Sequence, residues 1–283
     1  MEYNLKILDY GQNNLDLHYY SFNRKKSDGF DITDAVDFDF TLRESTDNDI
    51  IKELHSINSS LSRTKNTIYD YCRSNKWEWF CTFTFSPNLV DRTDYTMCYK
   101  KISKWFQNIK RRAPNLKYIL IPELHKKNKI GDNYAWHFHA LITDCAGLHF
   151  EEYICRNNKP LTIKGRLIYT IKEYTLGFCN AQKIEDTTKI SRYITKYITK
   201  EFCFKTKGRQ RYLCSKGLKK PKEYYLHVDD IQDLYQIFNI TYEKNYDVNA
   251  PNYHYFIKYL QSQEVDLDCI LIELKNKKGW YAL

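Results

Sequence analysis

Apolar residues recur every three or four positions in two long segments, and this spacing predicts two amphipathic helices. The first covers residues 50–75 and the second covers residues 94–112. Three basic residues at 110–112 close the second helix, where they interact favourably with the helix dipole. The apolar stripe of this helix should face the core, and it comprises Tyr95, Cys98, Ile102, Trp105, Phe106 and Ile109.

Shorter apolar or alternating segments predict five strands. Their ranges are 77–85, 116–123, 135–143, 178–184 and 210–214. Helices that lie between the strands of a mostly antiparallel sheet cover one of its faces and leave the other free. The predicted fold class is therefore α+β, with a central antiparallel β-sheet, flanking helices, and extensions at both ends of the chain.

The chain of 283 residues is long enough for one domain of ordinary size with appendages. We expect an N-terminal extension with a lead-in helix over 1–75, a catalytic domain over 76–222 and a C-terminal appendage over 223–283. Further helices are expected near 165–174 and, within the appendage, near 253–260.

The run around His137 and His139 is the clearest candidate for chemistry in the sequence. Side chains alternate between the faces of a strand, so the two histidines point one way while Trp136 and Phe138 point to the core. Two imidazoles on one face can hold a divalent metal ion. Pairs with this spacing also occur by chance on solvated strands, so the pair alone does not decide between these interpretations.

The preceding strand ends on Glu123 and His125, and a polar segment joins it to the histidine strand. A hairpin would bring Glu123 or His125 beside the pair. Two histidines and one carboxylate suit Mn²⁺ or Mg²⁺, with positions left open for substrate oxygens. We favour Glu123 as the third ligand and keep His125 as the alternative; the other interpretation is that both residues only cap a strand.

A second candidate is the segment 189–200, in which Tyr-Ile-Thr-Lys occurs twice in tandem. A helix here would begin after Asp186 or Thr187 as N-cap and run to about Phe202. The bland interpretation is a surface helix with packed tyrosines and solvated lysines. Residues three and four apart share a helix face, and the stripe so formed contains Tyr193, Lys196, Tyr197 and Lys200.

The two candidates together suggest one reaction. Tyrosine has a pKa of about 10 and is a poor nucleophile at neutral pH. It becomes effective when a cation stabilises the phenolate and a metal polarises the electrophile. A phosphodiester fits this arrangement, because the metal would bind a non-bridging oxygen while the tyrosine attacks phosphorus and becomes linked to DNA.

From Trp77 to Leu218 the sequence resembles the rolling-circle replication initiators of the His-hydrophobic-His (HUH) superfamily, especially the two-tyrosine group of phages and plasmids. The N- and C-terminal extensions depart from the best-known initiators, and no helicase segment is recognisable. The motifs occur in the family's order, and they are Phe80–Phe85, Pro122–Glu123 with Trp136–Leu141, Arg192–Lys200 and the closing strand Arg211–Leu218.

The resemblance implies a ferredoxin-like or RNA-recognition-like sheet and a site-specific enzyme that nicks and joins DNA. It implies a 5′-phosphotyrosyl adduct and a free 3′-OH that primes a polymerase, with a host polymerase and helicase as possible partners. Two tyrosines would let one cut a new strand while the other holds the displaced end. The roles it implies are metal ligation by His137, His139 and Glu123, nucleophilic attack by Tyr193 and Tyr197, and phosphate or phenolate neutralisation by Lys196 and Lys200.

The formal charge of +9 is unevenly distributed, and basic residues outnumber acidic ones over 183–222. Cations with interleaved aromatic rings suit single-stranded nucleic acid, since they meet phosphates and unstacked bases. A solvated basic face is the commoner origin of such a run, but its position beside the tyrosines favours DNA contact. The residues expected to contact nucleic acid are Arg192, Lys205, Lys207, Arg209 and Arg211.

Nine scattered cysteines without a Cys-x-x-Cys pair indicate a reducing compartment. No signal peptide and no apolar run long enough to span a bilayer is recognisable, so we expect no membrane partner and a location in the cytoplasm of a bacterial host cell.

Two other functions remain open. The first is a transposase or conjugative relaxase with related chemistry, although relaxases carry a third histidine after the pair and small single-strand transposases lack tandem tyrosines. The second is a non-catalytic nucleic-acid-binding protein, which would bind DNA without forming covalent adducts.

Overall fold

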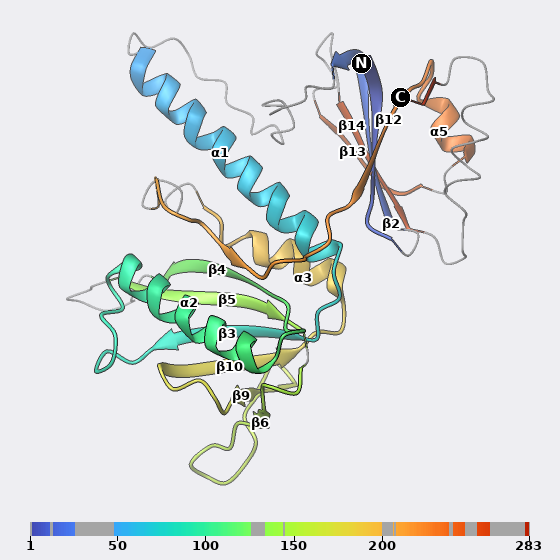
Figure 1. The fold of residues 1–283 in the computed structure, drawn as a ribbon. Helices are drawn as coiled ribbons and strands as arrows, with labels where there is room; N and C mark the ends of the chain where they lie inside the picture. The colour runs from blue at the N-terminus through green and yellow to red at the C-terminus, as the bar shows by residue number, and fades with distance from the viewer. Residues whose placement is uncertain are drawn as a thin grey trace. The chain divides into compact units, whose positions relative to one another are not determined.

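A computed structural model gives the fold of the chain (Figure 1). The chain divides into two compact units, one made of Met1–Glu44 with Lys220–Leu283 and the other of Ser45–Lys219. No described helix is long and apolar enough to cross a membrane. The structure describes residues 2–11, 14–25, 48–125, 134–143, 145–199, 206, 208–237, 240–246, 254–260 and 281–282.

The unit Ser45–Lys219 is built on an antiparallel sheet with the strand order β11-β4-β5-β3-β10-β9-β6. A separate hairpin is formed by β7 and β8. The strands are β3 (Trp79–Phe85), β4 (Tyr118–His125), β5 (Ala135–Ile142), β6 (Phe150–Glu152), β7 (Thr162–Ile163), β8 (Arg166–Leu167), β9 (Tyr169–Ile171), β10 (Gly177–Lys183) and β11 (Leu213–Cys214).

The four long strands β3, β4, β5 and β10 lie in the order β4-β5-β3-β10 (Figure 1). The first and third of them in the chain are therefore central, as in a ferredoxin-like sheet. Between β5 and β10, where that fold has a second helix, the described residues form the short strands β6 to β9 instead. The predicted α+β class with a central antiparallel sheet and flanking helices is confirmed.

Helix α2 (Tyr95–Arg112) packs on one face of this sheet. It begins after Asp94, whose carboxylate accepts hydrogen bonds from the backbone N–H groups of Thr96 and Met97. Its apolar stripe is buried as predicted, and the ring of Phe83 in β3 contacts Trp105 and Phe106. This face of the sheet forms the hydrophobic core.

The helices α1 (Asn48–Arg73) and α3 (Thr187–Thr195) contact each other. Asp186 is the N-cap of α3 and accepts a hydrogen bond from the backbone N–H of Lys189. Ile194 and Ile198 are fully buried in the same core cluster as the sheet. Helix α3 therefore has a fixed start and a buried anchor.

The second unit contains a six-stranded antiparallel sheet in the order β13-β14-β2-β1-β12-β15. The side chain of Asn4 links its first strand to the chain after β12, because it donates to the carbonyl of Val228 at 2.7 Å and accepts from the N–H of Val228 at 2.8 Å. The elements are β1 (Glu2–Asp9), β2 (Asn14–Lys25), β12 (Lys222–His227), α5 (Gln232–Ile237), β13 (Ile240–Tyr246), β14 (His254–Leu260) and β15 (Tyr281–Ala282).

Three expectations about local structure are wrong. Residues 165–174 contain β8 and β9, and residues 254–260 form β14, so neither segment is the helix that its spacing suggested. Both segments are rich in aromatic and β-branched residues, which favour strands once a pairing partner is present. Helix α3 ends at Thr195 and does not continue to Phe202.

The division into units also differs from the boundaries expected at 75/76 and 222/223. Helix α1 belongs to the unit of the seven-stranded sheet, and β1 pairs with β12, so the two ends of the chain build one sheet. Pairing between strands more than 200 residues apart leaves no local signal in the sequence.

Candidate functional site

The site is organised by the pairing of β5 with its two neighbours. On β4, Glu123 lies opposite His137 and Ile121 lies opposite His139. Residues directly opposite each other in an antiparallel pair share a face. The predicted hairpin therefore brings the carboxylate and both histidines together on the face opposite α2.

On the other side of β5, strand β3 places a threonine opposite each histidine. The hydroxyl of Thr82 lies 3.1 Å from Nδ1 of His139, and the hydroxyl of Thr84 lies 3.4 Å from Nδ1 of His137. Metal-binding histidines commonly have their second ring nitrogen held by such a partner, which fixes the orientation of the ring. These two threonines were missed from the sequence because their role depends on the register between β3 and β5.

Glu123 and His139 are in direct contact, with 2.7 Å between Oε2 of the carboxylate and Nε2 of the ring. The side chain of His139 is only 7% exposed, whereas that of Glu123 is 30% exposed. Burial alone would raise the pKa of Glu123, but the hydrogen bond to His139 and the fields of His139, His125 and His137 together lower it. Glu123 is therefore a carboxylate at neutral pH.

His137 is held in its neutral form by its surroundings. Burial is the largest cause, followed by the positive field of His125, and together they lower the pKa of His137 to about 4 despite the opposing field of Glu123. The ring centroids of His125 and His137 are 5.2 Å apart, so the alternative third ligand also lies next to the pair. A neutral imidazole is the form that ligates metals.

The donors fit a small divalent cation in kind and in placement. Two ligand atoms at right angles around such an ion are about 3 Å apart, close to the 2.7 Å between Glu123 and His139. Within the described ranges, no three His, Cys, Asp or Glu side chains converge closely enough to hold an ion as they stand. A bound ion would therefore require small side-chain rotations, above all at His137.

The two tyrosines meet directly above this cluster. The ring of Tyr197 stacks on His139, with 3.6 Å between centroids and 13° between planes. The hydroxyl of Tyr197 donates to the hydroxyl of Tyr193 at 2.9 Å. Phe80 supports both, because its ring stacks on His139 at 5.8 Å and meets Tyr193 edge-on at 5.7 Å. Both candidate nucleophiles therefore lie beside the candidate ligands.

The tyrosines are not on one helix as predicted, because α3 ends between them. After Thr195 the backbone makes a tighter turn, in which the N–H groups of Tyr197 and Ile198 donate to the carbonyls of Ile194 and Thr195. β-branched residues lose rotamer freedom in a helix, and this segment is rich in isoleucine and threonine. The tight turn carries Tyr197 back over the sheet.

The environments of the two phenols differ. Tyr193 is 44% exposed, and Nζ of Lys196 lies 5.7 Å from its ring centroid. Burial, the hydrogen bond to Tyr193 and the fields of Tyr193 and Glu123 all raise the pKa of Tyr197. The more exposed phenol thus accepts a hydrogen bond from the less exposed one.

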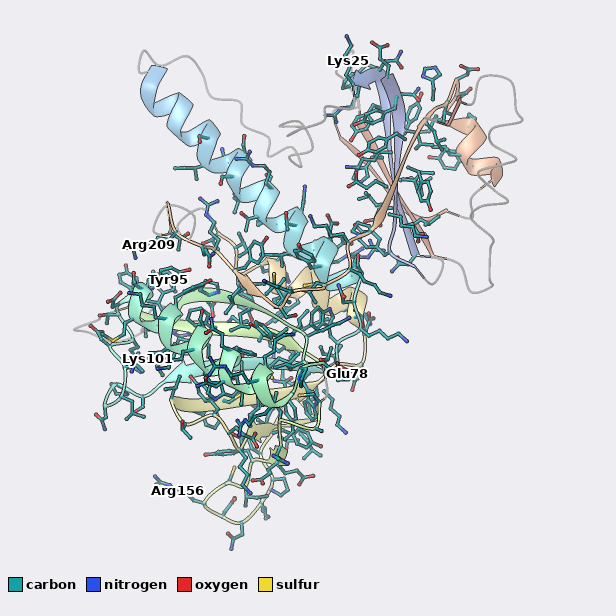
Figure 2. The ribbon with its side chains drawn as sticks, in the orientation of Figure 1. Lys25, Glu78, Tyr95, Lys101, Arg156 and Arg209 are labelled. Atoms are coloured by element: carbon teal, nitrogen blue, oxygen red, sulfur yellow. The ribbon has the colours of Figure 1, made fainter. Side chains whose placement is uncertain are left out.

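The predicted nucleic-acid contacts lie in different settings. Arg192 is exposed in the last turn of α3. The guanidinium of Arg209 lies over the ring of Tyr95, at 5.9 Å, and the two labelled side chains are close in Figure 2. Arg211 donates a hydrogen bond to the hydroxyl of Ser60 in α1. Lys200, Lys205 and Lys207 lie outside the described residues.

These contacts fix the chain that leads into β11. The hydroxyls of Tyr95 and Tyr99 in α2 donate to the backbone carbonyl and the side-chain oxygen of Gln210. Arg209 and Arg211 therefore have packing partners in the protein, a structural role that the charge pattern did not reveal.

Residues 78–202 match the family model of the replication-associated protein ORF2. The matched region begins just before β3 and ends just after the tandem tyrosines, so it contains the whole cluster described above. The match supports a replication initiator role. Neither the curated proteins nor the solved structures contain a significant match to this chain.

We expect His137 to titrate near pH 4 in the absence of metal, below the ordinary value of 6.5. The unfolded chain binds a proton below pH 6.5 that the folded chain refuses, so the stability that His137 contributes above pH 6.5 is lost as the pH falls from 6.5 towards 4. Imidazole NMR spectra recorded in EDTA and assigned with His137→Asn would measure this. A midpoint at or above 6.5 would contradict the burial described here.

Proposed function

We propose that this protein is a replication initiator that nicks and rejoins single-stranded DNA through tyrosine attack on phosphorus. The observation that carries the proposal is the contact of two tyrosines with the histidine–carboxylate cluster, where Tyr197 stacks on His139 and hydrogen-bonds Tyr193. The match of residues 78–202 to a replication-associated family supports the same conclusion.

In the proposed reaction a phenolate oxygen attacks the phosphorus of one phosphodiester. The new tyrosine–phosphorus bond replaces the bond to the 3′-oxygen of the preceding nucleotide, which leaves as a 3′-OH after it gains a proton. The product is a 5′-phosphotyrosyl adduct, and attack by a 3′-OH on that adduct reverses the step. One phosphodiester is exchanged for another, so rejoining needs no external source of energy.

Tyr193 is the better candidate for the first attack. It is the more exposed of the two phenols, so DNA can reach it. The hydrogen bond donated by Tyr197 and the nearby ammonium of Lys196 both stabilise a phenolate at Tyr193. The same hydrogen bond raises the pKa of Tyr197, which would act second, once the DNA has changed its surroundings.

Mn²⁺ or Mg²⁺ would be held by Glu123, His137 and His139, with His125 in reserve. Such an ion neutralises charge on a non-bridging phosphate oxygen during the attack. The chain's own contribution is to keep His137 neutral, to keep Glu123 ionised and to hold both imidazole rings through Thr82 and Thr84.

The partners follow from this chemistry. The DNA strand would come from a replication origin, and the 3′-OH would be extended by a host polymerase, with a host helicase separating the strands, in the cytoplasm of a bacterial cell. Transposases and relaxases share the chemistry, and the match to a replication-associated family favours the initiator over them. A non-catalytic DNA-binding protein would have no use for paired phenols beside a histidine–carboxylate cluster.

We expect Tyr193→Phe and Tyr197→Phe each to impair at least one strand transfer, and the double variant to form no covalent adduct. Each substitution removes the nucleophilic oxygen and keeps the packed ring. The assay is a denaturing gel of the protein mixed with single-stranded oligonucleotides from its own replicon and Mn²⁺. Tyr235→Phe is the matched control, because Tyr235 is similarly exposed, at 40%, and lies in α5. Adduct formation by the double variant would refute the nucleophile assignment.

The ligand assignment is tested separately with His137→Ala and Glu123→Gln. We expect cleavage to fall at least about 100-fold, while DNA binding measured by anisotropy changes little because the basic residues remain. His149→Ala is the control, since His149 contacts Glu173 away from the cluster. Cleavage by His137→Ala/His139→Ala at the parent rate, or cleavage by the parent chain in excess EDTA, would show that no metal is held here.

A further inference from the structure

The row of the sheet that contains Glu123 and His137 continues to an exposed aromatic ring. His137 lies opposite Thr84 on β3, and Thr84 lies opposite Phe178 on β10. Opposed residues share a face, so Phe178 belongs to the face that carries the candidate site. Neighbouring strands are about 4.8 Å apart, so Phe178 is about 10 Å from His137 across two strands.

Phe178 is 40% exposed, although phenylalanine is among the residues most often buried. Its ring meets Tyr153 edge-on, with 5.1 Å between centroids and 82° between planes. Tyr153 is only partly buried, so the two rings together present an aromatic surface. No function described so far uses either ring.

The position of Phe178 is set by a close approach of two strands. A Cβ atom on Gly177 would collide with the carbonyl oxygen of Thr84, so only glycine fits where β10 meets β3. The N–H of Ser86 also donates to the carbonyl of Leu176 at 2.9 Å. The backbone beneath the ring is therefore tied to the strand that supports the histidines.

The segment directly after Tyr153 is basic. Residues 154–167 contain four cations and no acidic residue, and Figure 2 shows Arg156 pointing outward from this loop. Arg166 pairs with Glu185 at 3.0 Å. Three further cations on this segment are exposed and available to phosphates, and they are Arg156, Lys159 and Lys164.

We propose that Phe178 and Tyr153 form a base-stacking platform for the single-stranded DNA whose phosphate is attacked at the tyrosine site. The inference rests on the proposed function and extends it to a residue that orients the substrate. An aromatic ring offers a face on which any base can stack, and nearby cations attract the backbone. Because the platform shares a sheet face with the cluster, it would hold a base within the first few nucleotides of the scissile phosphate.

The test measures coupling between the ring and one base. Equilibrium binding is measured by anisotropy in the full-length Tyr193→Phe/Tyr197→Phe chain, so that cleavage does not interfere. The ligands are an intact oligonucleotide and a series in which one nucleotide at a time lacks its base. Phe178→Ala should weaken binding of the intact strand about 5- to 150-fold. The same variant should show no further loss with the strand that lacks the stacked base.

The controls separate stacking from folding. Phe178→Trp should keep the parent affinity, because it preserves an aromatic face. Phe22→Ala should leave binding unchanged, since Phe22 is equally exposed, at 39%, but lies on β2 in the other unit. Circular dichroism during heating would show whether each variant is folded.

Three results would overturn the platform: unchanged binding by Phe178→Ala, an equal loss with every strand of the series, or no binding of any strand by the parent chain. A failure of the nicking chemistry is recognised separately, because adduct formation is measured on the chain with both tyrosines intact. Coupling to one base without any adduct would keep the platform and reject the reaction.

Discussion

The register of β5 between β4 and β3 is the constraint on which the site depends. It places Glu123 opposite His137 and a threonine hydroxyl opposite each histidine, all on one face of the sheet. It also turns Phe138 and Trp136 into the core under α2. Because side chains alternate along a strand, a slip of one residue would exchange the two faces and remove both the site and the core. The burial of large rings therefore protects the arrangement of the polar groups.

The tyrosines depend on the sheet in turn. Tyr197 lies on His139, and Phe80 from β3 supports both His139 and Tyr193. The segment that carries the tyrosines is held at its start by the Asp186 cap and at its end by the burial of Ile198. A tight turn between these two anchors replaces the expected last turns of the helix. The nucleophiles are thus positioned by packing against the candidate metal ligands, and a change at either group should be felt at the other.

Much of the candidate site could be predicted from the sequence because its signals are local. The alternation around His137 gave the strand, the polar segment before it gave the hairpin, and both Glu123 and His125 lie where the hairpin predicts. The core stripe of α2 followed from its 3.6-residue period. Their chemical roles stay predictions, since no bound ion or DNA is present to report on them.

The remaining features depend on contacts between distant segments. Thr82 and Thr84 acquire partners only through strand register, and β1 finds β12 across most of the chain. Residues 254–260 have aromatic residues at a spacing compatible with a helix, yet they pair with β2 and β13. Arg209 and Arg211 looked like DNA contacts and instead pack on α2 and α1. Local pattern does not encode such choices, because tertiary pairing overrides propensity.

The central claim is that a tyrosine above the histidine–carboxylate cluster becomes covalently attached to DNA. The most direct measurement is peptide mass spectrometry of the parent chain after reaction with an origin oligonucleotide and Mn²⁺, followed by nuclease and protease digestion. The account predicts a nucleotide joined through its 5′-phosphate to Tyr193 or Tyr197. Attachment at any other residue, or a nicked strand with a free 5′-phosphate and no attached protein, would contradict it.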